Sequence, residues 1–426
     1  MPQVTSATVR LRWLLWCPAL ASAAFLLVQA LQLATHNHND LDVYLVGARH
    51  LFDGTMYTNR SSLFGLPFLY PPIAGLAFLP LTWIKLKTAV YLWAVFNCVL
   101  LVGLIGVSLR AARPSMPWSR LLWWSLALAW PAYHLDPIFQ TMNFAQINIL
   151  LAFLIMGDLA ISRQFLQRAL PEGVLLGLAA AVKLTPLVFV PFLALAKRTR
   201  TAVTVVVTFA AATLLMFAVV PRLSWSFWTN YAFKASRVGV YYISDQNVQA
   251  AVVRINHALV PKLVVDVVVL AVGVSGVVVA AWAYRASSRL LGVLVAAATG
   301  LLVSPISWDH HMVWVVPVIG WLWLGHDRPK FGKLWAIATA VLFWQAPIWW
   351  VPTDNGTQFS LHGLNLFYGN SFFFATLLFV VGIAVMLTLR RRSSRADPTQ
   401  AVVGNRAGNG QSEPPHLKEP SVVGSG

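Results

Sequence analysis

The sequence predicts an all-α polytopic membrane protein, because apolar residues dominate its composition and recur in long runs separated by short basic clusters. Of its 426 residues, 58% are apolar and 11% are charged, and the mean hydropathy is +0.68. Soluble globular proteins average about 45–50% apolar and about 25% charged residues. The composition therefore excludes a water-soluble domain, and the 19 Trp and 10 Tyr fit the aromatic belts of membrane interfaces.

The first apolar run, at about 14–33, is long enough to cross the hydrocarbon layer and longer than the apolar part of a signal peptide. We interpret it as a retained first helix. A short run broken by prolines, 70–83, predicts a re-entrant or interfacial segment, and the run 172–196, interrupted by Lys183 and Pro186, predicts a broken hairpin. Nine further spans are expected at about 89–109, 121–135, 146–162, 201–220, 263–284, 289–305, 312–325, 334–350 and 372–389.

The basic residues predict the orientation of these spans, since Lys and Arg near helix ends tend to stay in the cytoplasm. An arrangement with both termini inside places nineteen of the 31 Lys and Arg residues at cytoplasmic flanks and explains the net charge of +17 without nucleic acid. We expect a cytoplasmic tail, 1–12, a transmembrane domain, 13–390, and a disordered cytoplasmic tail, 391–426. The flanking clusters are Arg10/Arg12, Arg110/Arg113/Arg120, Arg163/Arg168, Lys197/Arg198/Arg200, Arg285/Arg289, Arg328/Lys330/Lys333 and Arg390/Arg391/Arg392/Arg395.

In this topology, unusual polar residues from at least five segments collect on the outer face. This convergence predicts a site at the exterior lipid boundary of a multi-pass cell-membrane protein. The residues are Asp40 and Asp42; Asn143, Gln146 and Asn148; Lys183; Asp245, Gln246 and Asn247; and Ser307 to His311.

Asp40 and Asp42 could deprotonate a hydroxyl group or bind a cation, or they could be solvated loop acids. Side chains two residues apart on a helix point in different directions, so only one of the two should face a given site. Asp40, with Tyr44 one turn further on, makes a plausible inward face.

Lys183 stands in an otherwise apolar stretch, where a charge costs at least about 2.5–3.5 kcal/mol on insertion scales. A lipid-linked phosphate is a natural counter-charge, and the alternative is a side chain that extends to the interface. His310 and His311 could donate a hydrogen bond to phosphate or sugar, or could simply be polar residues at a helix end. Adjacent histidines diverge and chelate poorly, and the sequence has no zinc motif, Gly-rich phosphate loop or soluble nucleotide-sugar domain, so we expect no metal and no cofactor.

Five motifs in this order resemble glycosyltransferase family 87 over roughly residues 12–390. They are Asp40-Leu41-Asp42-Val43-Tyr44, Tyr70-Pro71-Pro72, Lys183-Leu184-Thr185-Pro186, Asp245-Gln246-Asn247 and Ser304-Pro305-Ile306-Ser307-Trp308-Asp309-His310-His311. The resemblance implies a GT-C fold of about 10–12 transmembrane helices, with an external catalytic loop after the first helix. It also implies a polyprenyl-phosphate sugar donor and an active site on the periplasmic face.

By position, the resemblance implies that Asp40 is the catalytic base, with Asp42 as the fallback. Lys183 would contact the donor phosphate, and His310 or His311 would lie near that phosphate or the sugar. The predicted substrate-binding set also includes Asp42, Tyr44, Gln246 and Asn247.

Among family members, the chain is most similar to actinobacterial α-1,2-mannosyltransferases of phosphatidylinositol mannoside, lipomannan and lipoarabinomannan synthesis. This resemblance implies inverting transfer of mannose from polyprenyl-phosphate-mannose to the 2-hydroxyl of a mannosylated glycolipid. Two alternatives stay open: a polyprenyl-phosphate-arabinose-dependent arabinofuranosyltransferase and a lipid or sugar transporter.

Overall fold

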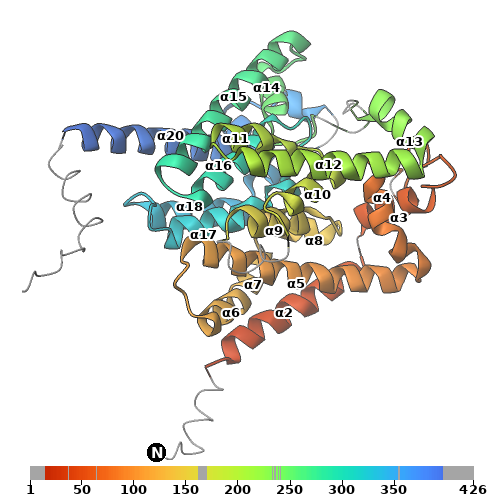
Figure 1. Ribbon diagram of the computed structural model, residues 1–426, viewed down its shortest axis with the longest axis horizontal. Coiled ribbons are helices and arrows are strands. Elements are labelled where there is room, and N and C mark those ends of the chain that lie inside the picture. Colours follow the sequence, from red (N-terminus) through yellow and green to blue (C-terminus); the bar gives the residue numbers. More distant parts are fainter. Residues whose placement is uncertain are drawn as a thin grey trace, which may run out of the picture. The chain divides into compact units, whose positions relative to one another are not determined.

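A computed structural model describes residues 15–36, 38–63, 65–161, 170–232, 234, 237, 239, 241–353 and 356–396 of the chain (Figure 1). Within these residues the fold is built of helices, and its only β-type pairings are two isolated bridges. The predicted all-α class is confirmed. The tail 1–12, the tail from residue 397 onward, and Arg163 with Arg168 lie outside the described residues.

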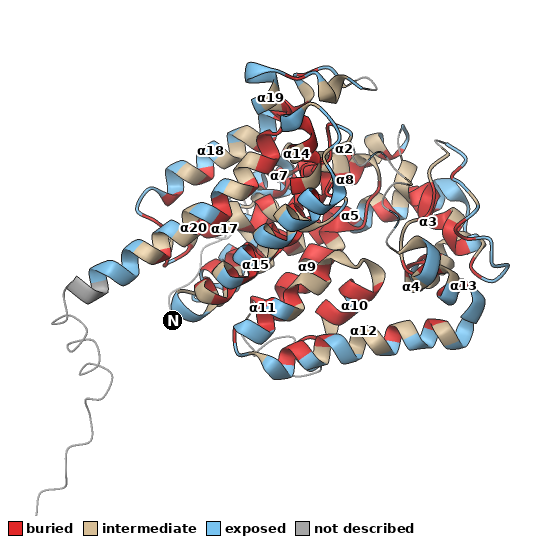
Figure 2. Ribbon diagram, turned by 90° about the horizontal axis from the view of Figure 1, so that it is seen from above, coloured by how far each residue is buried: buried red, intermediate tan, exposed pale blue. Residues whose placement is uncertain are grey.

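Among the residues that the structure describes, five helices are long and apolar enough to cross a membrane. They leave large apolar side chains on their outer surfaces: Leu214 is 66% exposed, and Leu263 is 75% exposed. Exposed apolar rows of this kind are unfavourable in water and favourable in lipid, and Figure 2 shows α12 as a largely exposed or half-exposed helix at the edge of the molecule. The chain is therefore a membrane protein, and its described residues provide five candidate spans. The five helices are α2 (Cys17–Ala34), α5 (Leu86–Ala112), α12 (Thr199–Val219), α15 (Lys262–Ala286) and α20 (Ser371–Ala396).

The other expected spans are shorter or interrupted helices. The run 121–135 is divided between α6 (Trp118–Ala127) and α7 (Ala129–Tyr133), and the run 312–325 between η5 (Asp309–Trp314) and α17 (Val315–Leu324). α18 (Gly332–Gln345) ends where Ala346 takes a left-handed φ of 44°. A helix of 14 residues is only about 21 Å long, so the number of full spans, about 10–12, stays a prediction.

The remaining helices are short and mostly connect the longer ones. Their bounds are α3 (Asn39–Arg49), α4 (Pro72–Phe78), η1 (Leu79–Trp83), α8 (Asp136–Asn143), α9 (Asn148–Leu159), α10 (Val174–Val182), η2 (Thr185–Val188), α11 (Phe189–Leu195), α13 (Pro221–Ser226), η3 (Phe227–Tyr231), α14 (Val248–Asn256), α16 (Arg289–Val303), η6 (Pro347–Trp349), η7 (Thr357–Phe359) and α19 (Gly363–Gly369).

The core is formed by three sets of closely packed helices. α5 packs against α2, α6, α9 and α17, and it runs from the α3–α4 region to α6 (Figure 1). α10 lies on α12 at Gly177, where a Cβ atom would come within 2.6 Å of the Thr208 side chain. α15 lies on α16 at Gly276, where a Cβ atom would come within 2.3 Å of Thr299. Only glycine permits these approaches.

The Asp158 side chain, near the end of α9, holds the first turn of α10. The Asp158 carboxylate accepts hydrogen bonds from the backbone N–H groups of Gly173 and Leu176, at 3.0 and 2.9 Å, and so satisfies donors that the first turn of α10 leaves unpaired. α10 ends at Val182, and Lys183 is in an extended conformation before η2 and α11. The predicted broken hairpin, with its break at Lys183 and Pro186, is confirmed.

Candidate active site

The first turn of α3 is docked on the loop between α8 and α9. The backbone N–H of Asp40 donates to the carbonyl of Phe144 at 3.0 Å. In that loop Ala145 has a left-handed φ of 56°, a conformation that side chains with a Cβ adopt at a cost. The next residue, Gln146, is 1% exposed. The strained loop therefore fixes Gln146 beside the start of α3.

Gln146 joins Asp40 and Tyr44. Its Oε1 accepts a hydrogen bond from the Tyr44 hydroxyl at 2.5 Å, and its side chain also hydrogen-bonds the Asp40 carboxyl. The Tyr44 hydroxyl lies 3.2 Å from that of Tyr70. Asp40 and Tyr44, one helical turn apart, therefore face the same polar centre.

Lys183 lies at the middle of the site. Its Nζ lies 3.0 Å from Asn148 Oδ1 and 3.0 Å from His311 Nε2, and 5.7 Å from the centre of the Tyr70 ring. Because the ammonium only donates, His311 Nε2 must accept, which places the ring proton of His311 on Nδ1. The Lys183 ammonium is thus oriented by three groups from three segments.

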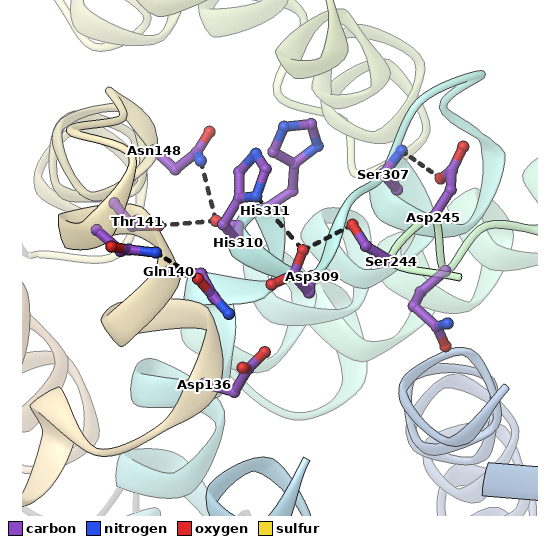
Figure 3. A network of polar contacts seen from close by, with 12 residues as sticks. Asp136, Gln140, Thr141, Asn148, Ser244, Asp245, Ser307, Asp309, His310 and His311 are labelled. Carbon is purple, nitrogen blue, oxygen red and sulfur yellow. Dashed lines mark hydrogen bonds and ion pairs between the residues drawn. The ribbon is translucent and has the colours of Figure 1, made fainter. Parts of the chain in front are cut away.

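His310 is held by its backbone and keeps its ring unbonded. Its carbonyl accepts hydrogen bonds from Thr141 Oγ1 and Asn148 Nδ2, both at 2.9 Å (Figure 3). His310 is buried, with only 3% of the residue exposed. Neither ring nitrogen has a hydrogen-bond partner among the described residues. The nearest charged atom is Asp309 Oδ1, 3.4 Å from Nδ1. Buried polar atoms without partners are rare in native structures and suggest a ligand.

A carboxyl pair lies below the histidines. Asp309 Oδ1 accepts a hydrogen bond from Ser244 Oγ at 2.7 Å, and Asp136 Oδ1 accepts one from Trp349 Nε1 at 2.9 Å. Burial, followed by the charge of Asp309, raises the pKa of Asp136 to about 8. The raised pKa favours the protonated form of Asp136, which reduces the repulsion between the two carboxyl groups.

The electrostatics around Asp40 balance burial against positive charge. Burial raises the pKa of the Asp40 carboxyl, and the charge of Asp309 raises it further. His310, the hydrogen bond from Gln146 and the charge of Lys183 all act in the opposite direction. A carboxyl whose pKa is raised is a stronger proton acceptor, which is what a general base requires.

Asp42 faces away from this centre. It is 3% exposed, and its Oδ2 accepts hydrogen bonds from the backbone N–H and the hydroxyl of Ser62 at 2.9 and 3.1 Å. The structure therefore separates the two aspartates: Asp40 lies in the polar centre, and Asp42 holds the loop after α3.

Gln246 bridges three backbone groups and does not point into the centre formed by Lys183 and the histidines. Its Nε2 donates to the carbonyls of Ile243 and Gly369 at 2.7 and 2.8 Å, and its Oε1 accepts from the N–H of Phe373 at 3.0 Å.

Asn247 likewise has structural partners. It caps α14 by accepting from Ala250 N–H at 2.7 Å and donates to the Ser304 carbonyl at 2.9 Å. Asp245 Oδ1 accepts from the N–H of Ser307 at 2.8 Å. The segment Asp245–Asn247, which we call the brace, therefore fixes the chain that leads into the histidines.

An apolar crevice of about 50 Å³ opens beside Lys183 and His311. It places the polar centre next to hydrocarbon-like walls, a combination that suits a phosphate carried on a lipid. The apolar side chains that line it are Leu151, Ile155, Val188, Phe189, Leu301 and Trp314.

Sequence reasoning did not assign a role to Tyr70, Asp136 or Asp309. Tyr70 precedes two prolines, and Asp136 precedes one at the start of a helix. Neither pattern indicates a site without the fold. Within the described ranges, no group of three His, Cys, Asp or Glu side chains could hold a metal ion.

Comparison with known proteins now identifies the family. The sequence profile of glycosyltransferase family 87 matches residues 68–305, more than half of the chain. The chain belongs to glycosyltransferase family 87. It is therefore a membrane glycosyltransferase, and the transporter alternative is not supported. Asp40, His310 and His311 lie outside the matched stretch.

Three curated relatives carry related names. A polyprenol-phosphate-mannose-dependent alpha-(1-2)-phosphatidylinositol mannoside mannosyltransferase of Mycobacterium tuberculosis is 34% identical over 346 residues, 75% of this chain and 78% of the relative. The protein of the same name in Mycolicibacterium smegmatis is 30% identical over 84% of this chain and 86% of its own length. A phosphatidylinositol pentamannoside mannosyltransferase of M. tuberculosis is 33% identical over 72% of each chain. No solved structure matches this chain.

Proposed function

We propose that this glycosyltransferase moves mannose from polyprenyl-phosphate-mannose to the 2-hydroxyl of a mannose on a phosphatidylinositol mannoside, with inversion, at the extracytoplasmic face. The printed names of the relatives support this donor and acceptor class. The observation that carries the proposal is the convergence of Asp40, Lys183 and the two histidines on one polar centre.

In this mechanism Asp40 is the general base. The acceptor oxygen attacks the anomeric carbon of the donor mannose, and its proton passes to the Asp40 carboxylate. The bond between the anomeric carbon and the phosphate oxygen breaks, and its electron pair leaves with the phosphate. Attack from the opposite side converts a β-linked donor into an α-linked product.

Lys183 stabilises the leaving phosphate. The phosphodiester of the donor becomes a phosphomonoester, so negative charge develops on it, and a cation already held in place by Asn148 and His311 meets this charge without reorganisation. The His310 ring, whose nitrogens have no partner among the described residues, offers an N–H for a second contact. The apolar crevice beside Lys183 would receive the first part of the polyprenyl chain.

The deciding experiment incubates the purified protein in lipid with labelled polyprenyl-phosphate-mannose and phosphatidylinositol mannosides. We expect one labelled glycolipid, with an α-1,2-linked terminal mannose by NMR. A parallel reaction uses the arabinose donor, and Asp40→Asn protein serves as the inactive control. A product formed only from the arabinose donor, or no product from either donor with wild-type protein, would overturn the proposal.

A further inference from the structure

A second cavity lies between α5, α6, α7, α17 and α18, outside the candidate active site. Its volume is about 740 Å³. Most of the side chains that line it are apolar. They include Leu109 of α5, Trp124, Leu128 and Leu135 of the α6–α7 stretch, and Ile319 and Trp323 of α17.

One end of this cavity is basic. Arg113 and Arg120 line it and are exposed, and within the part of the chain that the structure describes neither guanidinium has a hydrogen bond or an ion pair. The neighbouring Arg110 differs, because it donates to the carbonyls of Pro114 and Met116 at 2.7 and 3.0 Å. Arg110 therefore holds the α5–α6 turn, whereas Arg113 and Arg120 are available to an anion.

The basic end is the end far from the candidate active site. Along α6 and α7 the cavity extends from Arg120 to Leu135, roughly 20 Å at the rise of an α-helix. Asp136 follows Leu135 and begins α8, which packs against η5, the element that carries His310. The groove thus has the length of about one bilayer leaflet with its headgroup region, half of a total thickness of about 40–45 Å.

We propose that this groove binds an anionic phospholipid of the leaflet opposite the candidate active site, with its phosphate on Arg113 and Arg120 and one acyl chain along the apolar walls. Two guanidinium groups without a protein counter-charge favour a headgroup with net negative charge, and such basic pockets between membrane helices are typical lipid sites. Leu109, Leu128, Ile319 and their neighbours offer an anion no hydrogen bonds, so they fit an acyl chain.

Two variants test the two halves of the site separately. The Arg113→Gln/Arg120→Gln double variant removes the headgroup contact. Gly320→Leu fills the groove without a charge change, and the backbone tolerates it because a Cβ atom at Gly320 would have its nearest neighbour, Ser108 Cβ, at 3.6 Å. Arg200→Gln, a change of an exposed arginine elsewhere, is the matched control.

The measurement is native mass spectrometry of the delipidated full-length protein, titrated with phosphatidylglycerol, with phosphatidylcholine and with inorganic phosphate. We expect wild-type and Arg200→Gln protein to hold one phosphatidylglycerol at least ten-fold more tightly than phosphatidylcholine. The double variant should lose that preference, and Gly320→Leu should lose the bound lipid.

Three results would overturn the proposal: equal retention of the two lipids by wild-type protein, unchanged preference in the double variant, or unchanged lipid retention in Gly320→Leu. Inorganic phosphate that binds as tightly as phosphatidylglycerol would also overturn it, because the groove would then hold an anion without a lipid. A double variant that does not fold leaves Gly320→Leu as the decisive protein. None of these readouts requires glycosyl transfer, so they are independent of the proposed function.

Discussion

The polar centre around Lys183 and the brace at Asp245–Asn247 are both rich in buried polar side chains, yet they differ in how those side chains are satisfied. In the brace, Gln246 bonds three backbone groups, and Asn247 bonds two. In the centre, both ring nitrogens of His310 lack a partner. The two amides of the brace are therefore occupied by backbone groups, although Asp245 Oδ2 has no partner among the described residues. The His310 ring, in contrast, keeps both nitrogens for a ligand, because a buried polar group costs free energy until something bonds it.

Both regions act on the same short stretch of chain. The brace fixes residues 304–307 through Ser304 and Ser307, and the centre begins two residues later at Asp309. Substitutions in the brace should therefore destabilise the protein. Substitutions in the polar centre should abolish turnover and leave the fold intact. The following predictions test that division, from the largest expected effect to the smallest.

Replacing Asp40 should give the largest effect. We expect Asp40→Asn to lower kcat by at least about 10²-fold, since a general base contributes about 10²–10⁴-fold, with little change in Tm. Asp42→Asn is the matched control, and it should lower Tm because the neutral amide accepts the Ser62 hydrogen bonds more weakly than the carboxylate, while the folded protein keeps its turnover. An inactive Asp42→Asn beside an active Asp40→Asn would move the role of base to Asp42.

Replacing Lys183 should come next. Removing one preorganised donor to a developing charge costs about 10²–10³-fold in kcat, so Lys183→Ala should lose activity to that extent and also raise KM for the donor. Steady-state kinetics with varied donor concentration measure both effects. Lys87→Ala removes an exposed lysine and should change neither constant. Wild-type donor kinetics in Lys183→Ala would exclude this lysine from the site.

Replacing Gln246 should affect stability. Gln246→Ala leaves the polar groups of Ile243, Gly369 and Phe373 buried without partners, and each such group costs about 1–3 kcal/mol. Thermal unfolding should show a clear fall in Tm, and turnover per folded molecule should persist. Gln249→Ala, on the half-buried side of α14, should leave Tm close to the wild-type value. Loss of turnover at an unchanged Tm would instead place Gln246 in substrate binding.

The smallest effect should be a shift in pH dependence. Asp40 must be ionised to accept a proton, and burial raises its pKa, so kcat/KM should fall with decreasing pH at a higher pH than an ordinary aspartate would give. The hydrogen bond from Gln146 lowers that pKa. Gln146→Ala should therefore move the acid limb to higher pH, whereas Gln249→Ala should leave it in place. An acid limb that moves to lower pH would contradict this role for Gln146.

Apolar runs in the sequence predicted the helices well, but they did not predict where helices break. The run 121–135 was expected as one span, although it contains Ser125, Pro131 and His134, and the structure divides it into α6 and α7 at Leu128. The break at Lys183 and Pro186 was predictable because a charge and a proline mark it. Hydropathy reports the environment of a segment, whereas helix ends depend on local backbone bonds that neighbouring segments provide.

The same limit applies to the site. Lys183 was a candidate because a charge within an apolar run is costly. Asp40 was a candidate because it directly follows the first span and lies in a motif that resembles the family. Gln246 and Asn247 have the same polarity as ligand-binding residues, but they bond backbone groups, and three of these (Gly369, Phe373 and Ser304) are more than fifty residues away in sequence. Only the fold shows that these side chains are already occupied, and only the fold brings Asp136 next to Asp309.

Two contacts from α9, one at each end of α10, fix the position of Lys183. Asp158, at one end of α9, grips the first turn of α10, and Asn148, at the other end of α9, receives the lysine that follows the last turn. Because both contacts come from α9, the length of α10 between them sets the position of the Lys183 ammonium. Inserting or deleting a single residue between Gly173 and Lys183 would turn the lysine by about 100° around the helix axis and leave its charge facing the wrong wall.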